Sequence, residues 1–294
     1  MPDSCLCAQR TGRKPMMTFV TYLLFASAIS ISAEAFAAQS VPVTVKDGAT
    51  SLKGDLYLPD APAGSLPLVL VVHEWWGKNE FPASRARRIA DELGYAALAV
   101  DLYGQAKSAS TPQEAQALAA QFSKQPMLGV NRLKKFISTA PIAAKKAPAS
   151  IDMSKIAAIG YCFGGGQVLN LARANRLPKN QNLAGVVSFH GTLSSKLEAK
   201  TPIQPKLLVI HGDSDQMVKP QEVVQFKDEM ERANADLTFL SYPGASHAFT
   251  NPNATEVGKK YDIPIAYNAE ADTKSWNEMA TFLQRIFASR PISR

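Results

Sequence analysis

From residue 41 onward, short apolar runs alternate with longer amphipathic segments. The first two runs, 41–46 and 52–58, alternate apolar and polar residues on either side of Asp47-Gly48, which predicts an antiparallel hairpin. The later runs predict further strands, and 66–72 is apolar throughout, as expected of a strand buried on both faces. These strands cover 66–72, 96–102, 156–161, 183–189, 206–210 and 237–242.

Segments with apolar residues at helical spacing lie between these runs. The expected helices cover 84–93, 113–122, 130–140, 163–176, 220–234 and 269–288. Strands and helices that alternate over this length predict a mostly parallel sheet with helices on both faces. The N-terminal hairpin adds an antiparallel edge. We therefore expect an α/β fold.

The composition fits a folded globular protein. The 294 residues are 46% hydrophobic and 19% charged, which excludes a disordered, collagen-like or coiled-coil chain. The net charge of +7 is spread along the chain without a run of five basic residues, so nucleic-acid binding is not expected. The sequence has no Cys/His cluster with metal-ligand spacing, no phosphate-binding loop and no dinucleotide fingerprint. We expect neither a metal nor a cofactor.

The start of the chain has the pattern of a secretory signal peptide. A basic segment precedes an apolar stretch over 19–31, and the small-x-small triplet at 35–37 follows. We expect residues 1–37 to be removed and residues 38–294 to form a single exported domain, periplasmic or secreted, without stable membrane insertion. Cleavage after Ala38 is one alternative, and an uncleaved N-terminal anchor is another.

A candidate nucleophile follows the predicted strand 156–161. The segment 160–164 has the spacing G-x-C-x-G at a strand-to-helix junction, the pattern of a nucleophile elbow with cysteine in place of serine. The glycines leave room for a tight turn, and the helix N-terminus favours a negatively charged sulfur. Once the signal is removed, Cys162 is the one cysteine left. A buried core cysteine is the alternative interpretation.

Such a nucleophile needs a histidine and an acid that orients it. Of the four histidines, His247 follows the later strands and has an acid before it, so we expect it to be the base. Asp215, after the predicted strand 206–210, fits the order of nucleophile, acid and histidine. Asp213 is the alternative acid, and its other possible role is to brace the turn.

Five motifs, taken in order, resemble the dienelactone hydrolase family, a branch of the α/β-hydrolases. The resemblance covers the chain from about Val41 to the C-terminal helix. It implies the α/β-hydrolase fold and hydrolysis of a small-molecule ester or lactone through a cysteine acyl-enzyme, as in carboxymethylenebutenolidase-like enzymes. The motifs are HEWWG at 73–77, DLY at 101–103, the elbow at 160–164, G-x-x-D-x-x-V at 212–218 and HAF at 247–249.

The resemblance also assigns roles to residues beside these motifs. It implies that Glu74 takes part in activating the thiol and that the amides of Trp75 and Phe163 form the oxyanion hole. A structural ion pair with Arg85 is the alternative for Glu74. The aromatic residues expected to line the substrate pocket are Trp76, Tyr103 and Phe249.

The chain departs from the family where a substrate carboxylate would be held. Dienelactone-cleaving members use two arginines, whereas the corresponding neighbourhoods here, 101–105 and 247–251, contain none. Lys107 is nearby, but a lysine is a flexible point charge and cannot bind a carboxylate through two parallel hydrogen bonds as an arginine does. We therefore expect neutral esters or lactones, and the physiological substrate and the oligomeric state stay open. A catalytically silent ligand-binding relative is the alternative function.

The mature protein is expected to begin near Ala38, because the small-x-small triplet ends at Ala37. The intact mass of the exported protein should therefore lack residues 1–37. An exported form that retains them would contradict the predicted cleavage.

Overall fold

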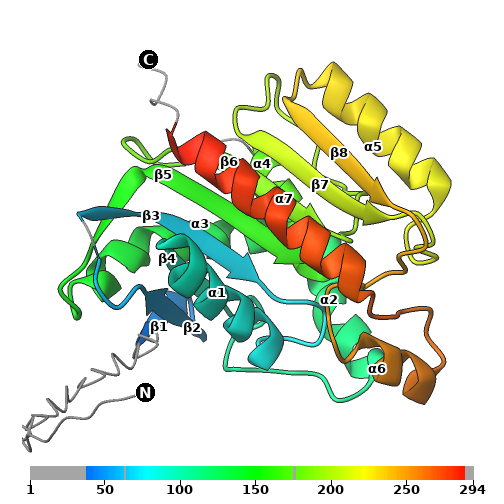
Figure 1. Cartoon of the computed structure of the whole chain (residues 1–294), viewed down its shortest axis with the longest axis horizontal. Coiled ribbons are helices and arrows are strands. Elements are labelled where there is room, and N and C mark those ends of the chain that lie inside the picture. The colour runs from blue at the N-terminus through cyan, green and yellow to red at the C-terminus, as the bar shows by residue number, and fades with distance from the viewer. Residues whose placement is uncertain (1–37, 63, 175–176, 289–294) are drawn as a thin grey trace, which may run out of the picture. The chain divides into compact units, whose positions relative to one another are not determined.

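The computed structural model describes residues 38–62, 64–174 and 177–288, so the predicted signal peptide lies outside the described residues. Within them, eight strands form one sheet in the order β1-β2-β4-β3-β5-β6-β7-β8 (Figure 1). The strands are β1 (Gln39–Asp47), β2 (Thr50–Leu58), β3 (Ser65–Val72), β4 (Ala96–Val100), β5 (Ser150–Tyr161), β6 (Leu183–Phe189), β7 (Lys206–Gly212) and β8 (Leu237–Tyr242).

The sheet is antiparallel at one edge and parallel elsewhere. β1 pairs with β2 and β2 with β4 in antiparallel register, and the remaining neighbours among the described strands are parallel. The hairpin turns at Gly48, whose φ of 59° lies in the left-handed region that glycine adopts without strain. The predicted α/β fold with an antiparallel N-terminal hairpin is confirmed.

Helices cover both faces of the sheet, as predicted (Figure 1). α1 and α7 contribute to one apolar core, whereas α3, α4 and α5 contribute to a second core on the other face. No helix among the described residues is long and apolar enough to cross a membrane. The described helices are α1 (Glu80–Leu93), α2 (Pro112–Lys124), α3 (Pro126–Ala144), α4 (Phe163–Ala174), α5 (Pro220–Arg232), α6 (Ala254–Tyr261) and α7 (Ala269–Ala288).

Two of the strand boundaries that differ from the prediction are set by polar residues. β5 begins at Ser150 rather than 156, since its partly exposed first residues pair with the start of β3. β4 ends at Val100 rather than 102 because the next residue, Asp101, turns the chain. The Asp101 carboxylate accepts hydrogen bonds from three backbone amides of the following loop.

The helix α6 was not predicted. Ala254, Val257 and Tyr261 stand at helical spacing, but eight residues are too few for that spacing to be recognised in the sequence. Tyr261, at its end, lies beside Trp76, with 6.2 Å between the ring centroids. α6 therefore connects the segment after His247 to the loop that follows β3.

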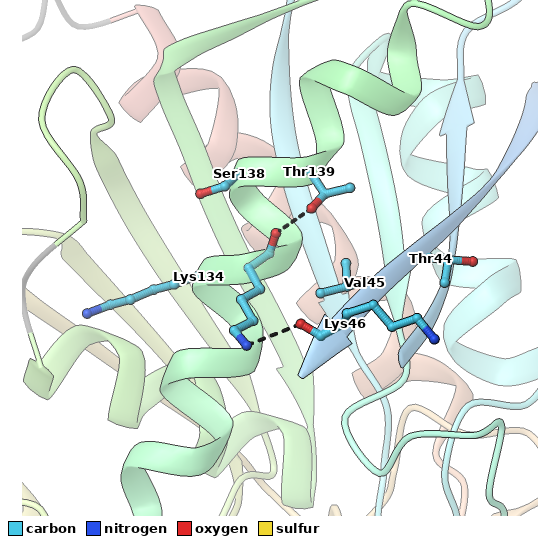
Figure 2. Close-up of a pocket in the computed structure, with 7 residues that line it drawn as sticks. Thr44, Val45, Lys46, Lys134, Ser138 and Thr139 are labelled. Atoms are coloured by element: carbon cyan, nitrogen blue, oxygen red, sulfur yellow. Dashed lines mark hydrogen bonds between the residues drawn. The ribbon is translucent and has the colours of Figure 1, made fainter. Parts of the chain in front are cut away.

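A pocket of about 370 Å³ separates the edge strand β1 from α3 (Figure 2). The Lys135 amine donates a hydrogen bond to the Lys46 carbonyl (3.2 Å) and pairs with Asp47 (2.8 Å). The Thr139 hydroxyl donates to the Lys135 carbonyl (2.9 Å). The two contacts of the Lys135 amine join the edge strand to the helix. Three strands lie between β1 and β5. The pocket is thus remote from the candidate site.

The predicted site residues follow strands of the parallel part of the sheet. Glu74 comes after β3, Cys162 after β5, Asp215 after β7 and His247 after β8. The carboxyl ends of parallel strands meet at one edge, where open α/β sheets place their binding sites. The fold therefore brings together residues that are far apart in the sequence.

Candidate active site

The turn between β5 and α4 is a strained elbow. Cys162 stands between the two elements with φ of 53°, in the left-handed region that residues other than glycine rarely adopt. A Cβ at Gly160 would lie 2.2 Å from the Gly164 carbonyl oxygen, and a Cβ at Gly164 would lie 2.5 Å from the Val72 carbonyl oxygen. Both flanking positions therefore require glycine, as the G-x-C-x-G spacing indicates.

His247 connects Asp215 to the elbow. Its Nδ1 lies 2.8 Å from Asp215 Oδ2, and its Nε2 is buried without another nitrogen or oxygen partner. Burial alone would lower the pKa of His247, but the neighbouring Cys162 and the hydrogen bond to Asp215 raise this pKa to about 10. The imidazole and the carboxylate thus form a hydrogen-bonded pair that also interacts electrostatically with Cys162.

The structure places Asp215, and not Asp213, against His247. Asp215 is buried, and its Oδ1 accepts the amides of Met217 and Val218. Burial would raise the pKa of Asp215, but the hydrogen bond from His247 and these two amides lower it, which keeps the carboxylate ionised. The exposed Asp213 accepts the Gly244 amide (2.7 Å) and so braces the adjoining turn.

Glu74 is buried and held by a neutral partner. Its Oε2 accepts a hydrogen bond from Asn251 Nδ2 (2.7 Å), whereas Oε1 has no partner. No hydrogen bond among the described residues joins Glu74 to the Cys162 thiol. Burial raises the pKa of Glu74 to about 7, although Asn251 and His247 oppose the shift. The alternative ion pair with Arg85 is wrong, because Arg85 pairs with Asp272 instead (2.9 Å).

His73 fixes the peptide that carries the Trp75 amide. Its Nδ1 lies 2.5 Å from the Glu74 carbonyl oxygen, and its Nε2 accepts the Leu102 amide (3.2 Å). Since N–H and C=O point in opposite directions across a trans peptide, binding this carbonyl also orients the Trp75 N–H. The Phe163 N–H belongs to the first residue of α4 and has no acceptor within the helix. Both amides are therefore candidates for an oxyanion hole.

A family model described as the dienelactone hydrolase family matches residues 52–287. The chain belongs to the dienelactone hydrolase family. A solved structure of a dienelactone hydrolase-like promiscuous phosphotriesterase from metagenomic libraries is 32% identical, covers 86% of this chain and 100% of its own, and has a TM-score of 0.75. The resemblance inferred from the five motifs is thereby confirmed, and the chain is a hydrolase of this family.

Curated relatives agree with this assignment. A Saccharolobus solfataricus protein named "Putative carboxymethylenebutenolidase" is 27% identical over 253 residues, which cover 74% of this chain and 89% of the relative. A Methylorubrum extorquens protein of the same name is 27% identical over 267 residues, covering 87% of this chain and 84% of the relative. The similarity therefore extends over most of each relative.

Thr250 anchors the loop that follows His247. The Thr250 hydroxyl lies 2.8 Å from His190 Nε2, and its carbonyl accepts a hydrogen bond from Arg85 (2.5 Å). Arg85 is held in turn by the buried carboxylate of Asp272. Two helices, α1 and α7, thus fix the position of the family's His-x-Phe segment through one threonine.

His190 lies beside the imidazole of His247. Their ring centroids are 5.3 Å apart in an edge-to-face arrangement, and His190 is fully buried. Burial, and then the neighbouring His247, lower the pKa of His190 well below its ordinary value. His190 therefore stays uncharged beside a histidine that becomes charged.

The predicted aromatic residues separate into pocket and core. Trp76 lines a pocket of about 370 Å³ together with Asn251 and Tyr261. Tyr103 is buried and donates its hydroxyl hydrogen to the Trp75 carbonyl (2.8 Å). Phe249 is fully buried between the rings of His190 and Tyr242. This corrects the expectation that Phe249 lines the substrate pocket.

Sequence reasoning missed Asn251 and Thr250 as functional residues. Both are buried, and both stand directly after the His-Ala-Phe motif. Two adjacent polar residues next to a predicted base were the available signal, because buried polar groups need partners. Within the described residues, no group of three or more His, Cys, Asp or Glu side chains is placed to hold a metal ion.

Glu74→Gln should stabilise the folded protein at alkaline pH. The pKa of Glu74 rises from an ordinary 4.5 to about 7 on folding, so its favourable contribution is complete below pH 4.5 and is lost as pH rises through 7. Above that pH the variant should exceed the wild type by about 3 kcal/mol in the free energy of unfolding.

Urea unfolding of both proteins at pH 5 and pH 8.5 measures this difference. Glu231→Gln is the matched control, because Glu231 is exposed on α5 and its carboxylate makes no hydrogen bond or ion pair among the described residues, and it should show little pH-dependent difference. Equal stability of Glu74→Gln and the wild type at pH 8.5 would refute a strongly raised pKa for Glu74.

Proposed function

We propose that this hydrolase cleaves a carboxylic ester or lactone through an acyl-enzyme on Cys162. The observation that carries the proposal is the hydrogen bond between Asp215 and His247. It fixes the orientation of the imidazole and leaves Nε2 without a partner, which supports a role for this nitrogen in receiving a proton from Cys162 at the strained elbow.

The proposed reaction has two halves. In the first, the Cys162 sulfur attacks the carbonyl carbon while His247 Nε2 receives the thiol proton. The tetrahedral intermediate then expels the alcohol oxygen, which takes that proton, and a thioester remains. In the second half, His247 removes a proton from water as it attacks the thioester. Collapse releases the acid and returns a proton to the sulfur.

The remaining groups support these steps. The amides of Trp75 and Phe163 would stabilise the negative oxygen of both tetrahedral intermediates. Glu74 would assist thiol activation, which its unpartnered Oε1 and its pKa of about 7 support, because such a carboxyl exchanges a proton readily near neutral pH. Asp215 would hold the imidazole in one tautomer and balance its charge.

The proposed substrate is neutral. Asn251 binds Glu74 through an uncharged amide, and Arg85 is occupied by Asp272 and Thr250, so neither offers a free cation to a substrate carboxylate. Trp76 offers an aromatic wall to an apolar group. We also propose export of the protein, on the pattern of residues 1–37.

Cys162→Ala should abolish hydrolysis, because removal of a nucleophile from such a triad costs about 10⁴- to 10⁶-fold in rate. The assay is a panel of acyl esters and lactones, with a phosphotriester included because a 32% identical relative is named a phosphotriesterase. Circular dichroism checks that the variant folds.

The outcome separates the rival functions. Loss of iodoacetamide labelling together with loss of hydrolysis supports the acyl-enzyme. An unchanged rate in Cys162→Ala would overturn it, and a wild-type protein without activity on the whole panel would favour the catalytically silent ligand-binding relative.

Asp215→Asn should lose far more activity than Asp213→Asn. Only the carboxylate bonded to His247 sets its tautomer, and the corresponding loss in related triads reaches about 10⁴-fold. Asp213 is the matched control because it lies two residues away and binds a turn amide. Comparison of kcat/KM for the two variants decides between them, and equal losses would reassign the acid.

A further inference from the structure

α4 carries a row of buried polar side chains beside the reactive cysteine. All residues of α4 are buried, and Gln167, Asn170 and Arg173 share one face because they are three positions apart. Arg173 pairs with Glu229 (2.7 Å) and donates a hydrogen bond to Asn170 Oδ1 (3.2 Å). This bond fixes the Asn170 amide and leaves its nitrogen free of Arg173.

A cavity of about 320 Å³ lies against this row. Its α4 wall includes Phe163, Gly166, Gln167 and Asn170, and Thr192 lies on another wall. Phe163, the residue directly after Cys162, lines the cavity, so the cavity begins next to the elbow that carries the candidate nucleophile. The volume lies within the range of small-molecule sites, about 300–1,000 Å³.

The buried amides of the cavity are not satisfied by the protein. Gln167 is 6% exposed, and its Oε1 is buried without a hydrogen-bond partner, close enough to Gly129 that a Cβ there would lie 2.1 Å away. No hydrogen bond among the described residues involves the amide nitrogen of Gln167 or of Asn170. The Gln167 oxygen faces Gly129, which does not line the cavity, whereas neither amide nitrogen is among the fully buried atoms. Both nitrogens can therefore donate to a molecule in the cavity.

The charge of the cavity favours an uncharged ligand. Its buried wall holds only neutral amides, and its exposed rim carries opposite charges. Lys196 lines the rim, and the Ser194 hydroxyl beside it donates to the Glu222 carboxylate (2.9 Å). A neutral group with several hydroxyls can accept from the amides and bond to the hydroxyl of Thr192.

We propose that this cavity is a subsite for a neutral polyhydroxylated group, so that the substrate is an ester of a sugar or polyol. The proposal rests on the ester hydrolysis proposed above. Gln167 and Asn170 bind the hydroxyls, Thr192 contributes from the opposite wall, and the Trp76 pocket takes an apolar part of the substrate.

The test compares two butyrate esters of similar size, 6-O-butyrylglucose and cyclohexylmethyl butyrate. The ratio of their kcat/KM values is measured in the wild type and in Gln167→Leu, with Gln225→Leu as the matched control because Gln225 is exposed on α5 and lines neither pocket. The wild-type ratio should favour the sugar ester by about tenfold or more. Gln167→Leu should reduce the ratio by about 2- to 10-fold, the effect of one lost hydrogen bond, and Gln225→Leu should leave it unchanged.

Thr192→Val gives a second measurement, because it removes the hydroxyl and keeps the β-branched shape that lies against Gly166 of α4. A wild-type ratio near one, or a sugar preference retained in both variants, would overturn the subsite while ester hydrolysis stands. If p-nitrophenyl butyrate is cleaved and both test esters resist, the subsite alone is refuted. If no ester is cleaved, the proposed function is refuted with it.

Discussion

The contact between the start of α4 and the end of β3 is the constraint on which the site depends. Gly164 faces the Val72 and His73 carbonyl oxygens so closely that any side chain there would collide with the backbone. This approach accompanies the left-handed conformation of Cys162 and brings the residues after β3 next to the start of α4. A wider turn would relieve the strain and separate the thiol from the groups around it.

A buried ion pair fixes the position of the loop that follows β8 relative to this elbow. Arg85 and Asp272 form a pair inside the protein, and that pair binds Thr250 through its backbone carbonyl. A buried ion pair contributes little net stability, because the loss of hydration offsets the attraction. The role of this ion pair is to fix the position of the segment that carries His247.

The sequence was informative wherever a local rule applied. Alternation and apolar runs located the strands, and the spacing of glycines around Cys162 located the elbow, because both depend on neighbours in the chain. The G-x-x-D spacing identified Asp215 rather than Asp213 as the partner of His247 in the structure. The order of elements then placed these residues at one edge of the sheet.

Contacts between distant segments could not be predicted in the same way. Arg85 and Asp272 are far apart in the sequence, and neither carries a motif that names its partner. Phe249 follows His247 closely in the sequence, but the orientation of its side chain depends on packing against His190. The helix α6 has only eight residues, too few for its apolar spacing to be recognised in the sequence.

The complete burial of α4 limits how this protein can diversify. Every side chain of that helix contacts the interior, so a change there alters packing as well as recognition. The segments over 104–111 and 192–200 include many exposed residues and tolerate substitution far better. New specificities in relatives should therefore arise by mutation of these loops, while the helix that bears the nucleophile changes slowly.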